Sequence, residues 1–195
     1  MYTQEHIEKI GNTIVFLTSN MTNVSKTKLL KLLYILDEIS IKTTGIPFLN
    51  LEYKVWKFGP VSNDIFVELS TSPSMLKEFI TLEYHNGNSY IGAKKEFCED
   101  EFSQNELELL SKVVSDFKDA TAEDLISITH RENYPWYNAA VKNCVLELFE
   151  SEKIRTTEFK INMAELIEHD ERKKSIYFEY LESSSNNNNN HCLKL

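Results

Sequence analysis

The stretch TKLLKLLYILDEISI, residues 27–41, decides the fold, because its apolar residues cover well over half the circumference of a helix. A helix that is apolar on most sides is typical of a protein interior. Ser25 is a good N-cap at its start, and Gly45 followed by Pro47 predicts its end. We therefore expect a central, largely buried helix around which the other elements pack.

The first half of the chain otherwise predicts one helix and several short strands. Apolar residues recur at spacings of three and four in residues 6–21, which indicates an amphipathic helix. Residues 51–58 have the β-branched and aromatic content of a strand, which ends at the Gly59-Pro60 corner. Two strand-like runs, 79–84 and 89–93, surround an Asn-Gly turn, the strongest short-range hairpin signal. We expect one small antiparallel sheet, with the strand before Gly59 as its third member.

The second half of the chain predicts further helices. Their N-terminal signals are two capping boxes and a proline at a first helical position: Ser103 with Glu106, Thr121 with Asp124, and Pro135. The apolar positions of residues 163–181 predict a last long helix. The expected fold class is mainly α (α+β), a compact helical domain with a small antiparallel β-sheet or hairpin.

Three segments are expected along the chain. Residues 1–150 are predicted to form the main domain, and residues 151–182 a C-terminal helical extension packed on it. Residues 183–195 begin with a run of Ser and Asn that has nothing to bury, so we expect them to form a mobile tail.

The composition excludes some classes of protein. The chain has 195 residues, 42% hydrophobic and 26% charged, which is typical of a globular protein with a real core. Its 21 Lys and Arg against 30 Asp and Glu give a net charge of −9, which argues against binding nucleic acid. Ten acidic and two basic residues lie between Glu96 and Asp124. Such a run is typical of a solvated face, and a docking surface for a basic partner is the alternative.

The cysteines and the hydropathy pattern favour a cytoplasmic protein. Cys98, Cys144 and Cys192 are too few and too scattered for a disulfide scaffold or a metal site. Cys144 stands in an apolar helical context, which predicts a small buried hydrophobe. The sequence has no signal-peptide pattern and no apolar run long enough to span a bilayer. We expect no membrane association, no metal and no cofactor.

The sequence signatures of common enzymes are missing. There is no Gly-rich phosphate loop, Gly-x-Ser-x-Gly elbow, His-Glu-x-x-His or Cys-x-x-Cys motif. Asp37 and His130 could do acid–base work together, since a carboxylate can fix a histidine tautomer. The alternative is that both satisfy buried backbone groups or cap loops. A small hydrolase using this pair, with Lys28 or Lys31 holding a phosphate, is a minor hypothesis, and we expect no enzyme.

Several motifs resemble those of a known family. The run KLLKLLY at residues 28–34 with Asp37, followed by WKFGPV at residues 56–61, resembles the hallmark of the Panacea domain. This antitoxin family includes SocA-like and phage-associated GepA-like proteins. The Thr129-His130 pair and the later Pro135-Trp136 pair are similar to the family's terminal His and Pro-Trp.

The resemblance implies a binding function. It implies an antitoxin that neutralises a protein toxin encoded by a neighbouring gene. Some SocA-like members are described as adaptors that hand the toxin to a cytoplasmic protease, so direct inhibition and proteolytic delivery both stay open. A phage or mobile-element protein that inhibits a host target is a further alternative.

We place the partner surface around the Gly59-Pro60 corner, because aromatic and cationic side chains are the usual hot spots of interfaces. The candidate partner-binding residues are Lys28, Lys31, Tyr34, Asp37, Trp56, Gly59, Pro60, His130 and Trp136. Core packing is the alternative role for both tryptophans.

Overall fold

The central helix expected from residues 27–41 is α2, Lys26–Thr44. The computed structural model describes residues 2–85 and 87–191, with side chains as far as residue 184. The Ser25 hydroxyl accepts a hydrogen bond from the backbone N–H of Lys28, and Gly45 ends the helix in the left-handed conformation. Helix α2 contacts both strand pairs and four other helices, α3 (Asn63–Glu68), α4 (Gln104–Phe117), α5 (Ala122–Thr129) and α8 (Glu171–His191). The prediction of a buried central helix is therefore confirmed.

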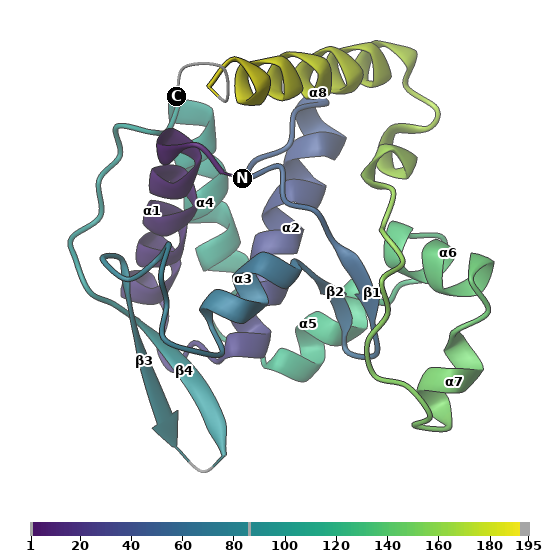
Figure 1. The fold of residues 1–195 in the computed structure, drawn as a ribbon, viewed down its shortest axis with the longest axis horizontal. Helices are drawn as coiled ribbons and strands as arrows, with labels where there is room; N and C mark the ends of the chain where they lie inside the picture. The colour runs from purple at the N-terminus through teal and green to yellow at the C-terminus, as the bar shows by residue number, and fades with distance from the viewer. Residues whose placement is uncertain (1, 86, 192–195) are drawn as a thin grey trace.

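Two helices cover one side of α2 (Figure 1). Helix α1, Gln4–Asn20, buries Ile10, Ile14 and Leu17 completely, as its apolar spacing predicts. Helix α4, Gln104–Phe117, begins with the predicted capping box and contacts both α1 and α2. These contacts place α4 against the central helix and α1 against α4.

The strands form two separate two-stranded antiparallel sheets, so the expected three-stranded sheet is wrong. Strand β1, Lys54–Trp56, pairs with β2, Gly59–Val61, and β3, Ile80–His85, pairs with β4, Asn88–Ala93. The hairpin prediction is confirmed, although residue 86 of its turn lies outside the described residues.

The edge of β1 that faces away from β2, and the edge of β4 that faces away from β3, are each hydrogen-bonded to a chain segment outside the sheets. These bonds explain why the two sheets do not join into one. On β1, the Val55 N–H donates to the Phe159 carbonyl at 2.9 Å, and the Ile161 N–H donates to the Tyr53 carbonyl at 2.8 Å. On β4, the Ile91 N–H donates to the Val24 carbonyl at 2.9 Å.

Short helices complete the other side of the molecule. They are α3 (Asn63–Glu68), α5 (Ala122–Thr129), α6 (Pro135–Lys142) and α7 (Leu146–Glu150). The Thr121 hydroxyl and the Asp124 carboxylate form the predicted capping box of α5, and Pro135 is the first residue of α6. Cys144, which follows α6, is exposed and has a φ of 53°, so its predicted burial is wrong.

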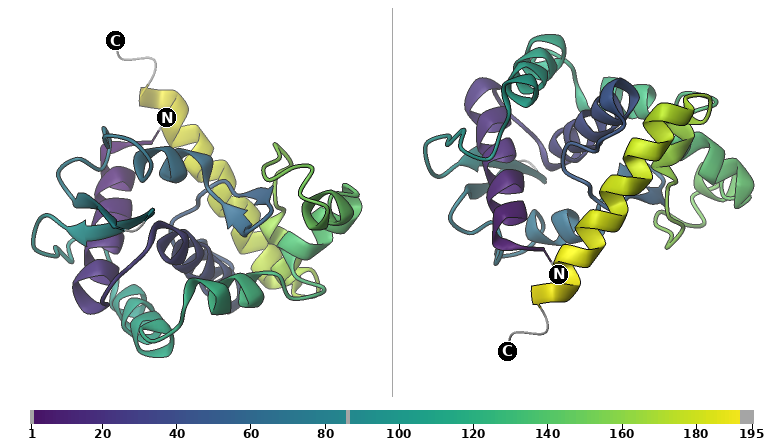
Figure 2. Two further views of the ribbon diagram at one scale, coloured as in Figure 1. Left: turned by 90° about the horizontal axis from the view of Figure 1, so that it is seen from below. Right: turned by 90° about the horizontal axis from the view of Figure 1, so that it is seen from above.

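The C-terminal part differs from the single helix expected over residues 163–181. A 3-10 helix, η1 (Met163–Ile167), comes first, and α8 spans Glu171–His191. The break falls where the Asp170 carboxylate accepts from the Lys173 N–H at 3.0 Å, a side-chain cap that starts a new helix. Helix α8 lies diagonally across the top of the molecule (Figure 2).

Residues 151–182 and the described part of residues 183–195 have a different backbone from the one predicted for the helical extension and the tail. Residues 155–161 are largely extended, and they continue the hydrogen bonding of β1. Helix α8 runs into the Ser and Asn segment as far as His191. The division into three segments and the mobility of the tail stay predictions. Within the described residues, none of the helices is both long and apolar enough to cross a membrane.

Candidate partner-binding site

Lys31 and the Gly59-Pro60 corner meet inside the molecule. Lys31 is 1% exposed, and its ammonium donates to the Pro60 carbonyl at 2.9 Å. Gly59 has a φ of 99°, and a Cβ there would lie 2.9 Å from Lys31 Cε and 2.9 Å from Thr129 Oγ1. The glycine therefore lets the lysine stem and α5 approach the corner closely. Burial lowers the pKa of Lys31 to about 7.

His130 and the two tryptophans form the next layer. The His130 ring stacks on Trp136 with centroids 3.6 Å apart and planes at 10°. The Trp136 indole N–H donates to the Trp56 carbonyl at 3.1 Å. Burial, assisted by the charge of Lys31, lowers the pKa of His130 to about 4, so its ring is neutral near pH 7. Among the described residues, the buried Nε2 of His130 has no hydrogen-bond partner.

Asp37 organises a different part of the core. Its carboxylate accepts from the backbone N–H groups of Leu49, Asn50 and Leu51, and from the Tyr53 hydroxyl at 2.8 Å. Burial raises the pKa of Asp37, while these hydrogen bonds act in the opposite direction.

The tyrosine of the motif packs beside this carboxylate. The Tyr34 ring packs edge-on against Tyr53 with centroids 5.1 Å apart. The contacts of Asp37 go to the loop after α2, and His130 is not among its partners in the described structure. The acid–base pair considered from the sequence is therefore not assembled in this arrangement.

Lys28 leads from the core to the surface. It is 6% exposed, and its ammonium donates to the Lys118 carbonyl at 2.8 Å. Burial lowers its pKa, and Asp119 partly offsets this effect. The hydrogen bond joins the start of α2 to the junction between α4 and α5, which forms one wall of a groove.

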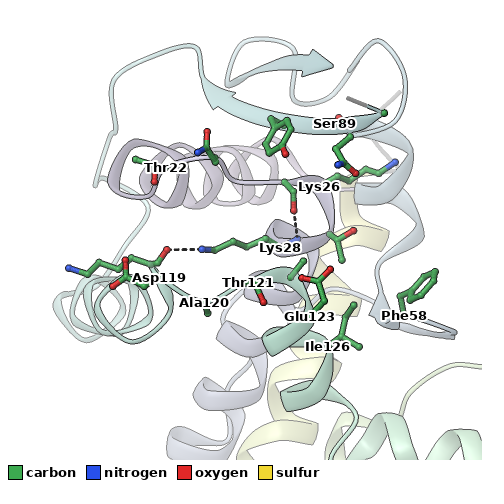
Figure 3. A pocket seen from close by; sticks show the side chains of 18 of the residues that line it. Thr22, Lys26, Lys28, Phe58, Ser89, Asp119, Ala120, Thr121, Glu123 and Ile126 are labelled. Carbon is green, nitrogen blue, oxygen red and sulfur yellow. Dashed lines mark hydrogen bonds between the residues drawn. The ribbon is translucent and has the colours of Figure 1, made fainter. Parts of the chain in front are cut away.

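This groove has a volume of about 810 Å³ and is lined by four segments distant in the sequence. They are the start of α2 with the residues before it, Phe58 of the β1–β2 turn, the α4–α5 junction with the first turns of α5, and the tip of the β3–β4 hairpin. Figure 3 shows Ser89 of the hairpin on one side, and on the other Thr121, the N-cap of α5, with Glu123 of that helix. Phe58 stands at the end opposite Asp119. Because a macromolecule can enter an open groove of this kind, it is the candidate contact surface.

Two aromatic side chains border the groove and are open to solvent. Phe58 is 52% exposed and Tyr84 is 63% exposed. Exposed aromatic groups at a groove are typical anchors for a protein partner. Neither residue is among those predicted from the sequence, although Phe58 directly precedes the Gly59-Pro60 turn, where a side chain often faces solvent.

Most of the predicted partner residues lie beneath this surface. Lys31, Tyr34, Asp37, Gly59, Pro60 and Trp136 are buried, Trp56 and His130 are half-buried, and Lys28 lines the groove. The structure brings together Lys31, the corner, His130 and the tryptophans, and it keeps Asp37 apart from them. In the part of the chain that the structure describes, no group of His, Cys, Asp and Glu is arranged to hold a metal ion.

The fold and the groove define a mainly helical protein with several buried polar side chains in an apolar core beneath an open groove. A family model described as antitoxin SocA-like, Panacea domain, matches residues 29–137, more than half of the chain. The chain therefore belongs to this family, and eight of the nine predicted partner residues lie within the match. Comparisons with curated proteins and with solved structures gave no match.

Proposed function

We propose that this protein is a cytoplasmic antitoxin that neutralises a cognate protein toxin by binding it directly, without catalysis. The observation that carries the proposal is the family match over residues 29–137, which runs from α2 to α6. Membership of an antitoxin family implies a toxin partner. The open groove is the part of the surface that best suits a protein partner.

The proposed contact surface is the groove with its two aromatic side chains. Phe58 and Tyr84 would enter pockets of the toxin, because aromatic groups bury a large area when a partner covers them. The buried residues Lys31, Gly59 and Pro60 would act indirectly, by fixing the backbone that presents Phe58. Their role in partner binding stays a prediction.

The charge distribution supports a toxin that is basic. The net charge is −9, and most acidic side chains between residues 96 and 124 are exposed. Opposite charges accelerate the encounter of two proteins, although they add less to the final affinity. A basic toxin would therefore associate faster at low ionic strength.

The test is co-expression with the product of the adjacent gene, scored by growth and by co-purification. Rescue of growth with a stable complex supports direct neutralisation. Rescue with loss of the partner protein indicates delivery to a protease instead. If the neighbour is harmless and does not co-purify, the cognate-toxin proposal fails, and inhibition of a host target becomes the better hypothesis.

Two matched variants test the surface. Phe58 is 52% exposed and Phe178, on α8, is 51% exposed, so alanine at either removes a similar solvent-facing ring. We expect Phe58→Ala to weaken toxin binding by about tenfold or more, as for an interface anchor. Phe178→Ala should bind like the unchanged protein. Equal binding by both variants would remove the groove from the interface.

A further inference from the structure

Strand β3 has an edge whose backbone groups face away from the rest of the protein. In an antiparallel pair, successive residues point their N–H and C=O groups alternately toward and away from the partner strand. The Lys94 N–H donates to the Phe79 carbonyl at 2.9 Å. The backbone N–H and C=O groups of residue 79 and of every second residue after it therefore point toward β4. Ile80, Leu82 and Tyr84 therefore point their backbone groups outward.

Two further hydrogen bonds agree with this alternation. The Ile91 N–H, opposite Leu82, turns away from β3 to the Val24 carbonyl at 2.9 Å. The Ile80 N–H donates outward to the Leu76 carbonyl at 3.2 Å. In the described structure, the outward backbone groups of Leu82 and Tyr84 have no such partner. The unpaired edge of β3 thus begins at Leu82, on the outer side of the hairpin in Figure 1.

A groove of about 530 Å³ runs beside this strand. It is lined by residues 71–73 and Lys77 of the loop before β3, by β3 itself, and by Lys94. The charged residues that line it are both lysines, on a protein whose net charge is −9. The Lys94 ammonium donates to the Lys77 carbonyl at 2.7 Å and lies 4.0 Å from the Glu78 carboxylate. Glu78 partly offsets the charge of Lys94, but the described lining residues include two lysines and no carboxylate, so the lining is positively charged and complements an acidic segment.

We propose that β3 receives an extended, locally acidic segment of the toxin, which adds to the sheet as a third strand. An open strand edge supplies backbone donors and acceptors for such an addition, and neighbouring pockets select the side chains. Leu82 and Tyr84 would hydrogen-bond to the added strand, and the two lysines would meet its carboxylates.

This inference rests on the proposed function, because the partner is the toxin. Tyr84 lines both grooves, so a toxin held at Phe58 is near this edge. The overall charge would steer the whole toxin, whereas the two lysines would select one local segment.

Proline at Leu82 tests the backbone part of the proposal. Because the Leu82 N–H points away from β4, Leu82→Pro removes an outward donor and leaves the hydrogen bonds between β3 and β4 in place. Leu82→Ala is the matched control, since it removes the side chain and keeps the N–H. We expect Leu82→Pro to bind the co-purified product of the adjacent gene about tenfold more weakly than Leu82→Ala. Thermal unfolding of each variant checks that the fold persists.

Charge reversal tests the side-chain part. Lys94→Glu should weaken binding several-fold, while Lys142→Glu, the same change at an exposed residue of α6, should have no effect. Amide hydrogen exchange supplies a readout without mutation, because the Leu82 and Tyr84 amides should be protected in the complex.

The outcomes separate this inference from the proposed function. If the unchanged protein binds the toxin, and Leu82→Pro binds as well as Leu82→Ala, the strand addition is refuted while the antitoxin function stands. If the unchanged protein neither binds nor rescues growth, both fail. If it self-associates, and Leu82→Pro abolishes that association but not toxin binding, a second copy of this chain occupies the edge and the toxin does not.

Discussion

Lys31→Met should make the protein more stable at neutral pH, because a buried ammonium costs more than it contributes. Lys31 is 1% exposed, and its ammonium donates a hydrogen bond to the Pro60 carbonyl. Methionine keeps much of the stem volume and carries no charge. The variant therefore separates the packing of this side chain from its ionisation.

The size of the effect follows from the pKa. Burial lowers the pKa of Lys31 from 10.5 to about 7. The unfolded chain therefore takes up the proton at higher pH than the folded one, and stability is lost as the pH falls from 10.5 toward 7. At about 1.36 kcal/mol per pH unit, the loss is about 2 kcal/mol between pH 9 and pH 7, and about 4 kcal/mol in all at pH 7. Losing the hydrogen bond to Pro60 offsets about 1–3 kcal/mol of the gain.

The assay is urea unfolding at pH 7, 8 and 9, followed by tryptophan fluorescence. We expect Lys31→Met to be about 1–3 kcal/mol more stable than the unchanged protein at pH 7. Its stability should also depend less on pH. Lys142→Met, at an exposed position, controls for the removal of one charge. A variant that is less stable at pH 7, or that keeps the full pH dependence, would refute the reasoning.

Three other substitutions or conditions test the core. Gly59→Ala should destabilise the protein by about 2 kcal/mol or more, because Gly59 has a φ of 99° and a Cβ there would be crowded. Gly87→Ala is the control: Gly87 has a φ of 80° but open space around it, so this variant should lose less stability in the same unfolding experiment. Asp37→Ala should destabilise by about 3–5 kcal/mol, because it leaves three buried donors and one half-buried donor without their acceptor. Tyr53→Phe should cost about 1 kcal/mol, and equal losses in the two variants would contradict the assigned hydrogen bonds. The pKa of His130 is lowered from 6.5 to about 4, so its contribution to stability should fall as the pH drops through that window, by about 1–2 kcal/mol after allowing for its partial exposure. His130→Phe should unfold with a weaker pH dependence between pH 6.5 and 4.

Local signals explain most of the fold that could be predicted. Short sequence patterns predict helix α2, the β3–β4 hairpin and the capping boxes. These patterns are apolar residues around most of a helix, an Asn-Gly turn, and Ser or Thr three residues before an acidic residue. These elements form where the chain predicts them, because their determining contacts lie within a few residues.

Long-range contacts determine the features that the sequence did not predict or predicted wrongly. The second neighbour of β1 is supplied by residues 155–161, about a hundred positions later, so no local pattern could separate the two sheets. The break at Asp170 depends on a single side-chain cap within an otherwise helical pattern. At the site, Lys31 and His130 have the chemistry of surface residues, and only the assembled corner shows that Lys31 is buried and His130 half-buried.

The dependence of β1 on residues 155–161 also sets the order of events during synthesis. The core includes Phe149, Ile161, Met163 and Ile167, all of which follow the stretch matched by the family. A ribosome that has finished that stretch must add about 30 more residues before these groups exist, which takes about 2–6 s. We therefore expect a newly made chain to complete its fold seconds after its family-defining motifs have been translated. Under the proposed function, a toxin that has already folded is free to act during that interval.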